Sequence, residues 1–353
     1  MSTRLRSFSK INLGLAVGPA RPDGFHALTT LYQTLALHDL VTVTARPAPQ
    51  TSITLTSDHP GVPDTQRGDP EKNTAFRIVD LALRHLSLTA EVTIDIQKRL
   101  PVQGGLGAGS ANAAAALIGL ERELITALPG PARLALAAQV GSDVPLFLLG
   151  GSVLGLGRGE EVYPFPDLPV TPCVVAIPGV GVSTAAAFRV LDSRIDAQMA
   201  AESLTSAPNT SKLEQLSRAL SAAWSPSGAN LGITSQISEP SPSGITRRTG
   251  DLAENPLLTL VRTGIENDFE QVVFHEHPSL RSTKRDLVGD SSVPEGSRAI
   301  YAALSGSGSA LFGLYRSMAD ASAAQQRVQS SGMQALLTET LPRPEYWRTM
   351  LEF

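Results

Sequence analysis

The sequence contains a single cysteine, Cys173, among 353 residues. One cysteine excludes an internal disulfide and a zinc site built from several cysteines. Cys173 begins the apolar run 173–177, which predicts a buried strand. We therefore interpret this side chain as a small core residue rather than a reactive thiol.

Excess positive charge and long apolar runs are also missing. The net charge is -4, which lacks the basic surface that non-specific nucleic-acid binding requires. No apolar run reaches the length of a membrane span, and residues 1–6 lead into a polar strand without the apolar centre of a signal peptide. We expect a cytoplasmic protein that binds neither nucleic acid nor membrane. A small anionic ligand remains compatible, because helix N-termini bind phosphate even on acidic proteins.

The chain length predicts two domains, and the hydrophobic fraction of 42% is enough for sizeable cores. Alternating residues with turn signals indicate hairpins near the N-terminus, followed by a strand, a glycine-rich loop and a helix. This order favours an α+β fold over a regular βα repeat. The expected elements are strands at 10–17, 40–44 and 92–96, a turn at 21–24, and helices over 73–85, from about 110, and over 132–140.

Residues 193–254 differ from the rest of the chain, because they are rich in Ser, Thr, Pro, Asn and Gly. Such a composition buries too little apolar surface to offset the entropy of ordering it. We predict a long, partly disordered insertion with one short helix over 213–224. A smaller insert is expected at 289–296.

The most informative segment is the glycine-rich run 104–109, which leads into an alanine-rich helix. Glycines let the backbone approach a ligand closely, and the free N–H groups of the following helix favour an anion. A Walker A loop would need Gly-Lys before Ser or Thr, and a dinucleotide fingerprint would need glycine at Ser110. We interpret the run as a phosphate-binding loop of another type, with a purely structural turn as the alternative.

Three segments resemble the motifs of GHMP kinases. Residues 104–110 resemble the central ATP-binding motif P-x-x-x-G-L-G-x-S/G-S-S, residues 304–312 resemble the third motif, and residues 9–13 fit the first. Taken alone, the 304–312 segment is equally compatible with a simple turn. The resemblance implies a phosphate-proximal loop of Ser305, Gly306, Ser307 and Gly308. The ATP-binding residues that it implies are Asn73 on the adenine side, Pro101, Gly104, Gly105, Leu106, Gly107, Ala108, Gly109, Ser110 and Ala111.

Other motifs are similar to those of one GHMP family, the 4-diphosphocytidyl-2-C-methyl-D-erythritol kinases. Residues 21–30 resemble R-x-D-G-Y-H-x-L-x-T, and residues 141–147 resemble G-A-D-V-P-F-F. The resemblance covers residues 6 to about 190 and about 257 to the end, in family order. Shorter matches are G-x-G-E at 157–160, V-S-T at 182–184 and N-D-F-E at 267–270.

The resemblance implies two α+β domains, with the active site in the cleft between them. The first, 1–165, holds the ATP-binding loop, and the second, 166–353, contains the insertion 193–254. It also implies ATP-dependent phosphorylation of the 2-hydroxyl of the methylerythritol group, in the non-mevalonate isoprenoid pathway. Mg²⁺ is expected to accompany ATP, with Ser110 as its protein neighbour and no dedicated carboxylate cage.

Phosphorylation of a hydroxyl requires a base that removes its proton and cations that offset charge on the phosphoryl group. The resemblance assigns these roles to Asp143 and Lys10. Taken alone, Asp143 lies in a turn where an acidic residue often caps a helix. Lys10 adjoins an apolar strand, where a lysine is costly to bury unless it is paired.

The family binds its substrate at positions that correspond here to Asn12, Phe25, His26, Tyr32 and Thr184. Tyr32 is expected to stack on cytosine or, alternatively, to pack in the core. Phe25 replaces the family tyrosine, while Ala108 and Ala111 replace a glycine and a serine in the ATP-binding motif. Two alternatives stay open: another GHMP kinase of the homoserine or mevalonate type, and a non-catalytic ATP-binding sensor. The sequence predicts no oligomeric state.

Overall fold

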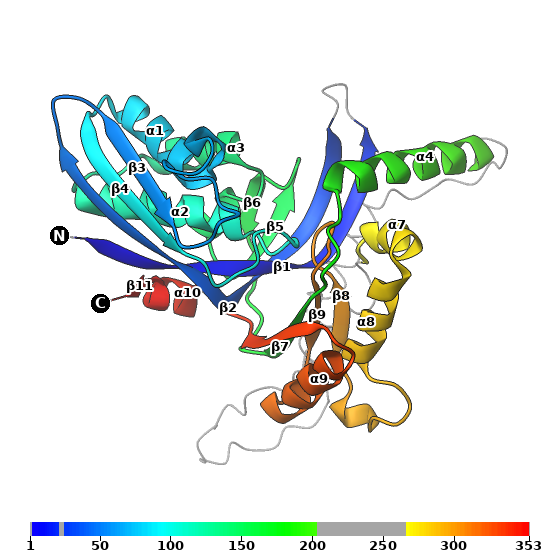
Figure 1. The fold of residues 1–353 in the computed structure, drawn as a ribbon. Coiled ribbons are helices and arrows are strands. Elements are labelled where there is room, and N and C mark those ends of the chain that lie inside the picture. Colours follow the sequence, from blue (N-terminus) through cyan, green and yellow to red (C-terminus); the bar gives the residue numbers. More distant parts are fainter. Residues whose placement is uncertain (1, 21–24, 203–265, 353) are drawn as a thin grey trace, which may run out of the picture.

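The computed structural model describes residues 2–20, 25–202 and 266–352. This part of the chain forms two β-sheets, one of seven strands and one of four, each covered by helices (Figure 1). The predicted α+β fold is therefore confirmed.

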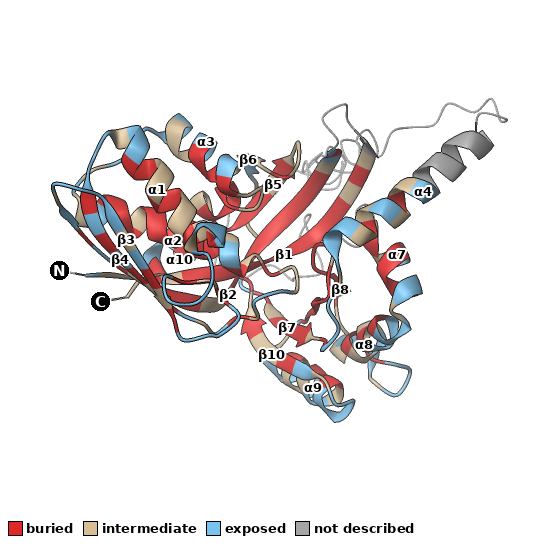
Figure 2. Ribbon diagram, turned by 45° about the horizontal axis from the view of Figure 1, so that its top comes forward, coloured by how far each residue is buried: buried red, intermediate tan, exposed pale blue. Residues whose placement is uncertain are grey.

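A long antiparallel hairpin joins the two halves of the molecule. Its strands are β1 (Thr3–Ala20) and β2 (His26–Pro47), drawn in blue across the width of Figure 1. The predicted turn at 21–24 lies outside the described residues. Residues 7–15 and 29–35 are buried without interruption, so these strands are covered on both faces where the halves meet (Figure 2). Simple alternation of polar and apolar residues therefore fails at the centre of the hairpin.

The first sheet has the order β11-β1-β2-β4-β3, with β5 paired to β2 and β6 paired to β5. Its burial pattern is clearest in β4 (Ala90–Gln97), where every second side chain is buried, as the predicted alternation requires. Helices α1 (Thr74–Leu86) and α2 (Ala108–Glu123) pack against this sheet, and α3 (Gly130–Val140) packs against α1. The remaining strands are β3 (Ser52–Ser57), β5 (Ser152–Leu156), β6 (Glu161–Pro164) and β11 (Leu351–Glu352).

The second sheet is antiparallel, in the order β10-β7-β9-β8. Cys173 lies in its strand β7 (Pro172–Ile177) and is fully buried, and this burial raises the pKa of its thiol. Its interpretation as an unreactive core residue is confirmed. The other strands are β8 (Tyr301–Leu304), β9 (Leu311–Leu314) and β10 (Gln334–Glu339), and the helices are α7 (Phe269–Glu276), α8 (Pro278–Val288) and α9 (Met318–Ser330).

Two segments depart from the boundaries expected from sequence. Helix α4 (Thr184–Glu202) includes residues 193–202, because its Ala, Arg, Gln and Met residues are good helix formers. The rest of the predicted insertion, with its short helix at 213–224, lies outside the described residues. Helix α10 (Arg343–Met350) and β11 return to the first sheet and contact β1, although they lie within residues 166–353. No helix in the described ranges is long and apolar enough to cross a membrane.

Candidate active site

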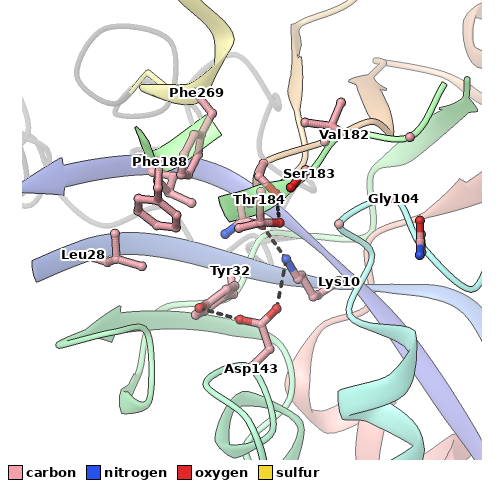
Figure 3. A pocket seen from close by; sticks show the side chains of 18 of the residues that line it. Lys10, Leu28, Tyr32, Gly104, Asp143, Val182, Ser183, Thr184, Phe188 and Phe269 are labelled. Carbon is pink, nitrogen blue, oxygen red and sulfur yellow. Dashed lines mark hydrogen bonds and ion pairs between the residues drawn. The ribbon is translucent and has the colours of Figure 1, made fainter. Parts of the chain in front are cut away.

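A cavity of about 770 Å³ is lined by residues from both halves of the molecule. Lys10, the glycine-rich loop and Asp143 come from the first half, and Val182 to Thr184 with the loop 306–308 come from the second. In Figure 3, Lys10, Tyr32 and Asp143 lie near the centre, Leu28 and Phe188 on one side, and Gly104 on the other. The cavity therefore joins a polar region to an apolar one.

Lys10 is a buried cation with two oxygen partners. Its side chain, on β1, is 3% exposed, and its Nζ donates to Asn12 Oδ1 at 2.6 Å. The same Nζ lies 3.3 Å from Asp143 Oδ2. These contacts offset the cost of burying an ammonium group. Asn12 is held in turn, because its Nδ2 donates to Thr30 Oγ1 at 2.7 Å.

Asp143 lies in the turn that precedes the short 3-10 helix Pro145–Leu148. That helix has no side-chain cap, so the alternative of Asp143 as its capping residue does not match the geometry. The carboxylate is instead held by Lys10 and by the Tyr32 hydroxyl, which donates to its Oδ1 at 3.0 Å. Because the Asp143 side chain keeps 30% exposure, it remains accessible from the cavity.

Tyr32 differs from the stacking role suggested by the sequence. Only 2% of the residue is exposed, it belongs to the hydrophobic core of the first half, as the alternative of core packing predicts, and its ring lies beside Lys10 and Asp143 (Figure 3). Burial, followed by the neighbouring negative charge of Asp143, raises the pKa of Tyr32 well above its ordinary value. The phenol therefore stays neutral and donates a hydrogen bond to the carboxylate.

The first glycine-rich loop lies directly on the Lys10 side chain. The Lys10 backbone N–H donates to Leu106 O at 3.0 Å. Gly107 has φ of 71°, and a Cβ at this position would lie 3.0 Å from Lys10 Cγ and 2.9 Å from Phe147 Cζ. Only glycine allows both this conformation and this approach. Helix α2 begins at the next residue, Ala108, so its N-terminus lies beside Lys10.

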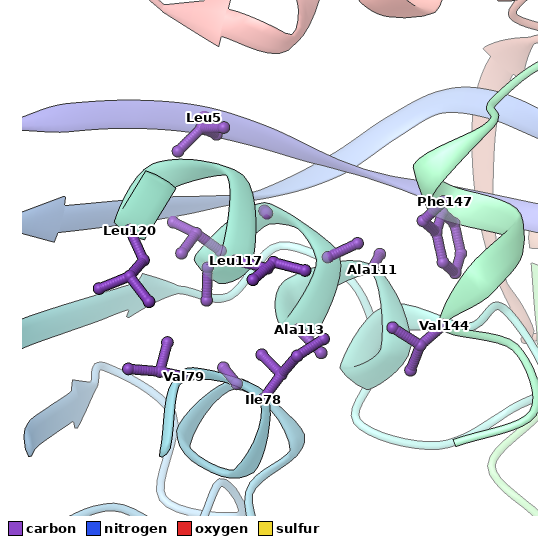
Figure 4. Packing of buried hydrophobic residues seen from close by; sticks show 14 of the residues in the cluster. Leu5, Ile78, Val79, Ala111, Ala113, Leu117, Leu120, Val144 and Phe147 are labelled. Carbon is purple, nitrogen blue, oxygen red and sulfur yellow. The ribbon is translucent and has the colours of Figure 1, made fainter. Parts of the chain in front are cut away.

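The buried face of α2 keeps the glycine loop in place. Ala111, Ala113, Leu117 and Leu120 are all buried, and they pack with hydrophobic residues of α1, of β1 and of the turn after Asp143 (Figure 4). Ala108 and Ala111, which depart from the family motif, are also buried, at 6% and 2% exposure. Their small side chains are therefore consistent with close packing at the start of the helix.

The second glycine-rich loop, 305–309, interlocks with the first. Ser305 Oγ donates to Gly105 O at 3.0 Å, and Ala310 N donates to Gly104 O at 3.1 Å. A Cβ on Gly105 would overlap the Ser305 carbonyl oxygen. The position of a Cβ on Gly306 would be 3.6 Å from Lys10 Nζ. Both loops thus converge on the Lys10 ammonium group.

Aromatic side chains gather on the apolar side of the cavity. The His26 ring stacks on Phe188, with centroids 5.0 Å apart, and Phe188 meets Phe269 edge to face at 4.9 Å. The His26 ring nitrogens each have a partner at 3.0 Å, Gly18 O for Nδ1 and Asp192 Oδ1 for Nε2. These contacts fix the ring against the first turns of α4.

The cavity brings together many of the residues predicted from sequence. Thr184 joins them through a hydrogen bond of 2.7 Å between its hydroxyl and that of Ser307. Phe25 is 51% exposed and stacks with the guanidinium group of Arg158, whose Cζ lies 4.9 Å from the ring centroid. The predicted residues that line the cavity are Lys10, Asn12, Tyr32, Gly104, Gly105, Asp143, Thr184, Gly306, Ser307 and Gly308.

Asn73 and Ser110 lie outside this lining. Asn73 caps α1, because its Oδ1 accepts from Ala75 N at 2.9 Å while its Nδ2 donates to Pro63 O at 3.0 Å. Both ends of its amide are therefore used by the backbone. Ser110, in the first turn of α2, faces the turn of Asp143, since a Cβ on Gly141 would lie 3.8 Å from its Oγ. The other predicted residues outside the lining are Phe25, His26, Pro101, Leu106, Gly107, Ala108, Gly109, Ala111 and Ser305.

Sequence reasoning missed several residues that line the cavity. Phe188 lies one helical turn after Thr184, and this i, i+4 spacing was a usable signal. Arg158 and Phe269 belong to recognised motifs to which no role was given. Leu28 belongs to the motif at 21–30, whereas Leu15 carries no signal of its own, because it reads as an ordinary strand residue.

Comparison with known proteins gives consistent results. The family model "GHMP kinases N terminal domain" matches residues 73–151. A 4-diphosphocytidyl-2-C-methyl-D-erythritol kinase of Solibacter usitatus is 37% identical over 312 residues, 88% of this chain and 81% of that protein. The protein of the same description from Gloeobacter violaceus is 33% identical over 323 residues, 91% of this chain and 88% of its own length.

Solved structures agree with the sequence relatives. A crystal structure of 4-(cytidine 5'-diphospho)-2C-methyl-D-erythritol kinase superposes with a TM-score of 0.64 at 25% identity, covering 96% of this chain and 98% of that one. Homoserine kinase from Cytophaga hutchinsonii gives 0.62 at 19% identity, covering 98% and 96%, and shows the fold alone. With near-full-length relatives above 30% identity, the chain belongs to the 4-diphosphocytidyl-2-C-methyl-D-erythritol kinase family of GHMP kinases.

Proposed function

We propose that this chain transfers the γ-phosphoryl group of ATP to the 2-hydroxyl of 4-diphosphocytidyl-2-C-methyl-D-erythritol, in the non-mevalonate isoprenoid pathway. The observation that carries the proposal is the Lys10–Asp143 ion pair, placed beside two interlocked glycine-rich loops in a cavity with an aromatic side. The specific substrate is inferred from the family to which the chain belongs. Because ATP is abundant there, we place the reaction in the cytoplasm.

In this mechanism, the Asp143 carboxylate accepts the proton of the substrate hydroxyl. The hydroxyl oxygen then bonds to the γ-phosphorus as the bond from that phosphorus to the β–γ bridging oxygen breaks, and ADP leaves. Lys10 Nζ, 3.3 Å from Asp143 Oδ2, offsets negative charge on the transferring group. One pair of side chains therefore provides both the general base and the positive charge that stabilises the transition state.

Tyr32 and Asn12 position this pair in the proposed mechanism. The Tyr32 hydroxyl donates to Asp143 Oδ1 at 3.0 Å, which fixes the carboxylate plane. Asn12 accepts from Lys10 Nζ at 2.6 Å and so limits the rotamers of the ammonium group. A preorganised pair needs little rearrangement as the phosphoryl group moves.

The triphosphate of ATP is proposed to bind at the N-terminus of α2, between the two glycine-rich loops. Free N–H groups in the first turn of a helix favour a phosphate. Among the described residues, no group of three or more His, Cys, Asp or Glu side chains is placed to hold a metal. The hydroxyl of Ser110 suits Mg²⁺, which binds largely through substrate phosphates and water. When bound, Mg²⁺ would neutralise phosphate charge.

The cytidine end of the substrate is proposed to occupy the apolar side of the cavity. The ring of Phe188 lines the cavity and is backed by His26, and it suits a pyrimidine ring, which gains from offset stacking. Phe269 extends this aromatic surface, and Phe25 lies against the cavity-lining Arg158. This feature favours a nucleotide-linked substrate over the small acceptors of homoserine and mevalonate kinases.

The test is a coupled ADP-release assay with the diphosphocytidyl substrate, mevalonate and homoserine as separate acceptors. We expect turnover only with the diphosphocytidyl substrate, and only when Mg²⁺ and ATP are present. Faster turnover with mevalonate or homoserine would overturn the assignment. ATP binding without turnover of any acceptor would support the non-catalytic sensor instead.

A further inference from the structure

The segment Asn267-Asp268-Phe269-Glu270 has no part in the proposed chemistry apart from the cavity-lining side chain of Phe269. We infer that Asn267 is a positioning residue for phosphoryl transfer, because its side-chain amide holds the loop 305–309 in place beside Lys10. The inference rests on the proposed kinase reaction and adds a residue to it. It concerns the second glycine-rich loop rather than the first.

The Asn267 side chain uses all its main hydrogen-bonding groups. It is 2% exposed, and its Nδ2 donates to both Leu304 O and Gly306 O at 2.8 Å. Its Oδ1 accepts from Phe269 N at 3.0 Å. An amide nitrogen has two hydrogens, so both are used on the loop and none remains. No other side chain of this size offers two donors and an acceptor from one amide plane.

These bonds determine which backbone groups of the loop remain free. The carbonyls of Leu304 and Gly306 are taken by Asn267, and Ser305 O accepts from Gly308 N at 3.0 Å. Across the described ranges, the amide N–H groups of Gly306 and Ser307 have no hydrogen-bond partner, and both residues line the cavity. A loop with occupied carbonyls and free N–H groups is suited to an anion such as phosphate.

The segment around Asn267 also links the loop to β1, the strand that carries Lys10. Its neighbours pair with β1, since Leu15 N donates to Glu266 O at 3.1 Å and Asp268 N donates to Leu15 O at 2.9 Å. The Asp268 carboxylate accepts from Val17 N at 2.8 Å. One short segment therefore connects β1 to the loop, and the distance between Lys10 and Gly306 depends on it.

Glu270 supports the same loop at Leu304. Its Oε1 accepts from Leu304 N at 2.8 Å, and its Oε2 accepts from Lys284 Nζ at 2.6 Å. Leu304 is thus held at both its N–H and its carbonyl by side chains of this segment. The motif acts as a clamp at the residue where β8 ends and the loop begins.

The decisive variant is Asn267→Asp. It keeps the size and the oxygen that accepts from Phe269 N, but it presents acceptors to two carbonyl oxygens. The loop is then repelled from its place, and a displacement of about 1 Å near the reacting groups is worth up to about 100-fold in rate. We expect kcat to fall about 10- to 100-fold. The KM of the diphosphocytidyl substrate should stay within about threefold, because the aromatic side is untouched.

Thr283→Ala is the matched control. Thr283 is 2% exposed in α8, in the same half of the molecule, and its hydroxyl donates to Ser279 O at 3.1 Å. Its loss removes a buried hydrogen bond outside the cavity, so the melting temperature should fall while kcat is kept. Asn267→Ser, which is smaller and uncharged, is measured in parallel in case the aspartate variant does not fold.

The possible outcomes distinguish a failure of the proposed kinase reaction from a failure of the proposed role of Asn267. A wild-type chain without turnover refutes the proposed reaction and the inference with it. An active wild type whose folded Asn267 variants keep kcat within about threefold refutes the positioning role alone. Loss of kcat in the Asn267 variants, with a melting temperature no lower than that of Thr283→Ala, supports it.

Discussion

Asp143→Asn is the substitution that tests the proposed mechanism most directly. Asparagine keeps the size of the side chain and an oxygen that accepts from the Tyr32 hydroxyl, but it is not a base at neutral pH. General-base catalysis is typically worth about 10²- to 10⁴-fold, so kcat should fall by that factor. The KM for ATP should change little, because the nucleotide is proposed to bind at α2 and the glycine-rich loops.

The structure also gives the expected effect on stability. Lys10 is 3% exposed and would lose its carboxylate while keeping Asn12. Breaking a fully buried ion pair costs about 3–5 kcal/mol, but Asp143 is 30% exposed, so we expect a loss of about 1–2 kcal/mol. A fall in the melting temperature of about 2–8 °C corresponds to this loss. The protein should therefore remain folded at assay temperature.

The assay combines steady-state ADP release with thermal unfolding of the same preparations. Tyr32→Phe is the control, since it removes one hydrogen bond to Asp143 but keeps the base. In the proposed mechanism Tyr32 only positions the base, so this variant should lose clearly less kcat than Asp143→Asn. If Asp143→Asn keeps kcat within about threefold of wild type, Asp143 is not the base.

Three further predictions follow from the cavity and the sequence. Gly105→Ala should raise the KM of ATP at least about tenfold, because the added methyl group would overlap the Ser305 carbonyl and separate the loops; a KM equal to wild type would contradict the interlocking. Phe188→Ala should raise the KM of the diphosphocytidyl substrate about 2- to 10-fold with little change for ATP, and an equal rise in both KM values would argue against a base-stacking role. Replacing residues 203–254 with a Gly/Ser linker should keep kcat within about threefold, since their composition is typical of a segment without a core; a folded variant with little activity would show a catalytic role.

The sequence by itself determined the local features of this protein. A glycine-rich run ending in a helix, an ordered set of motifs and a lysine in an apolar strand are all readable from neighbouring residues. The first glycine-rich loop and α2 occur where the pattern predicted them, with the helix beginning at Ala108 rather than Ser110. Local signals suffice here because backbone freedom and helix formation depend on residues close in sequence.

Only the tertiary structure decided which side chains meet. Tyr32 bonds to Asp143, 111 residues away, and Ser305 bonds to Gly105, 200 residues away. The pairing register of β1 with β2 places Tyr32 opposite Asn12 and so beside Asp143 rather than the aromatic side. The contacts of Asn267 are also long-range, since the carbonyl groups that it binds, those of Leu304 and Gly306, lie 37 and 39 residues further along the chain. Such contacts depend on how sheets and loops pack, and no periodicity in one segment encodes the partner in another.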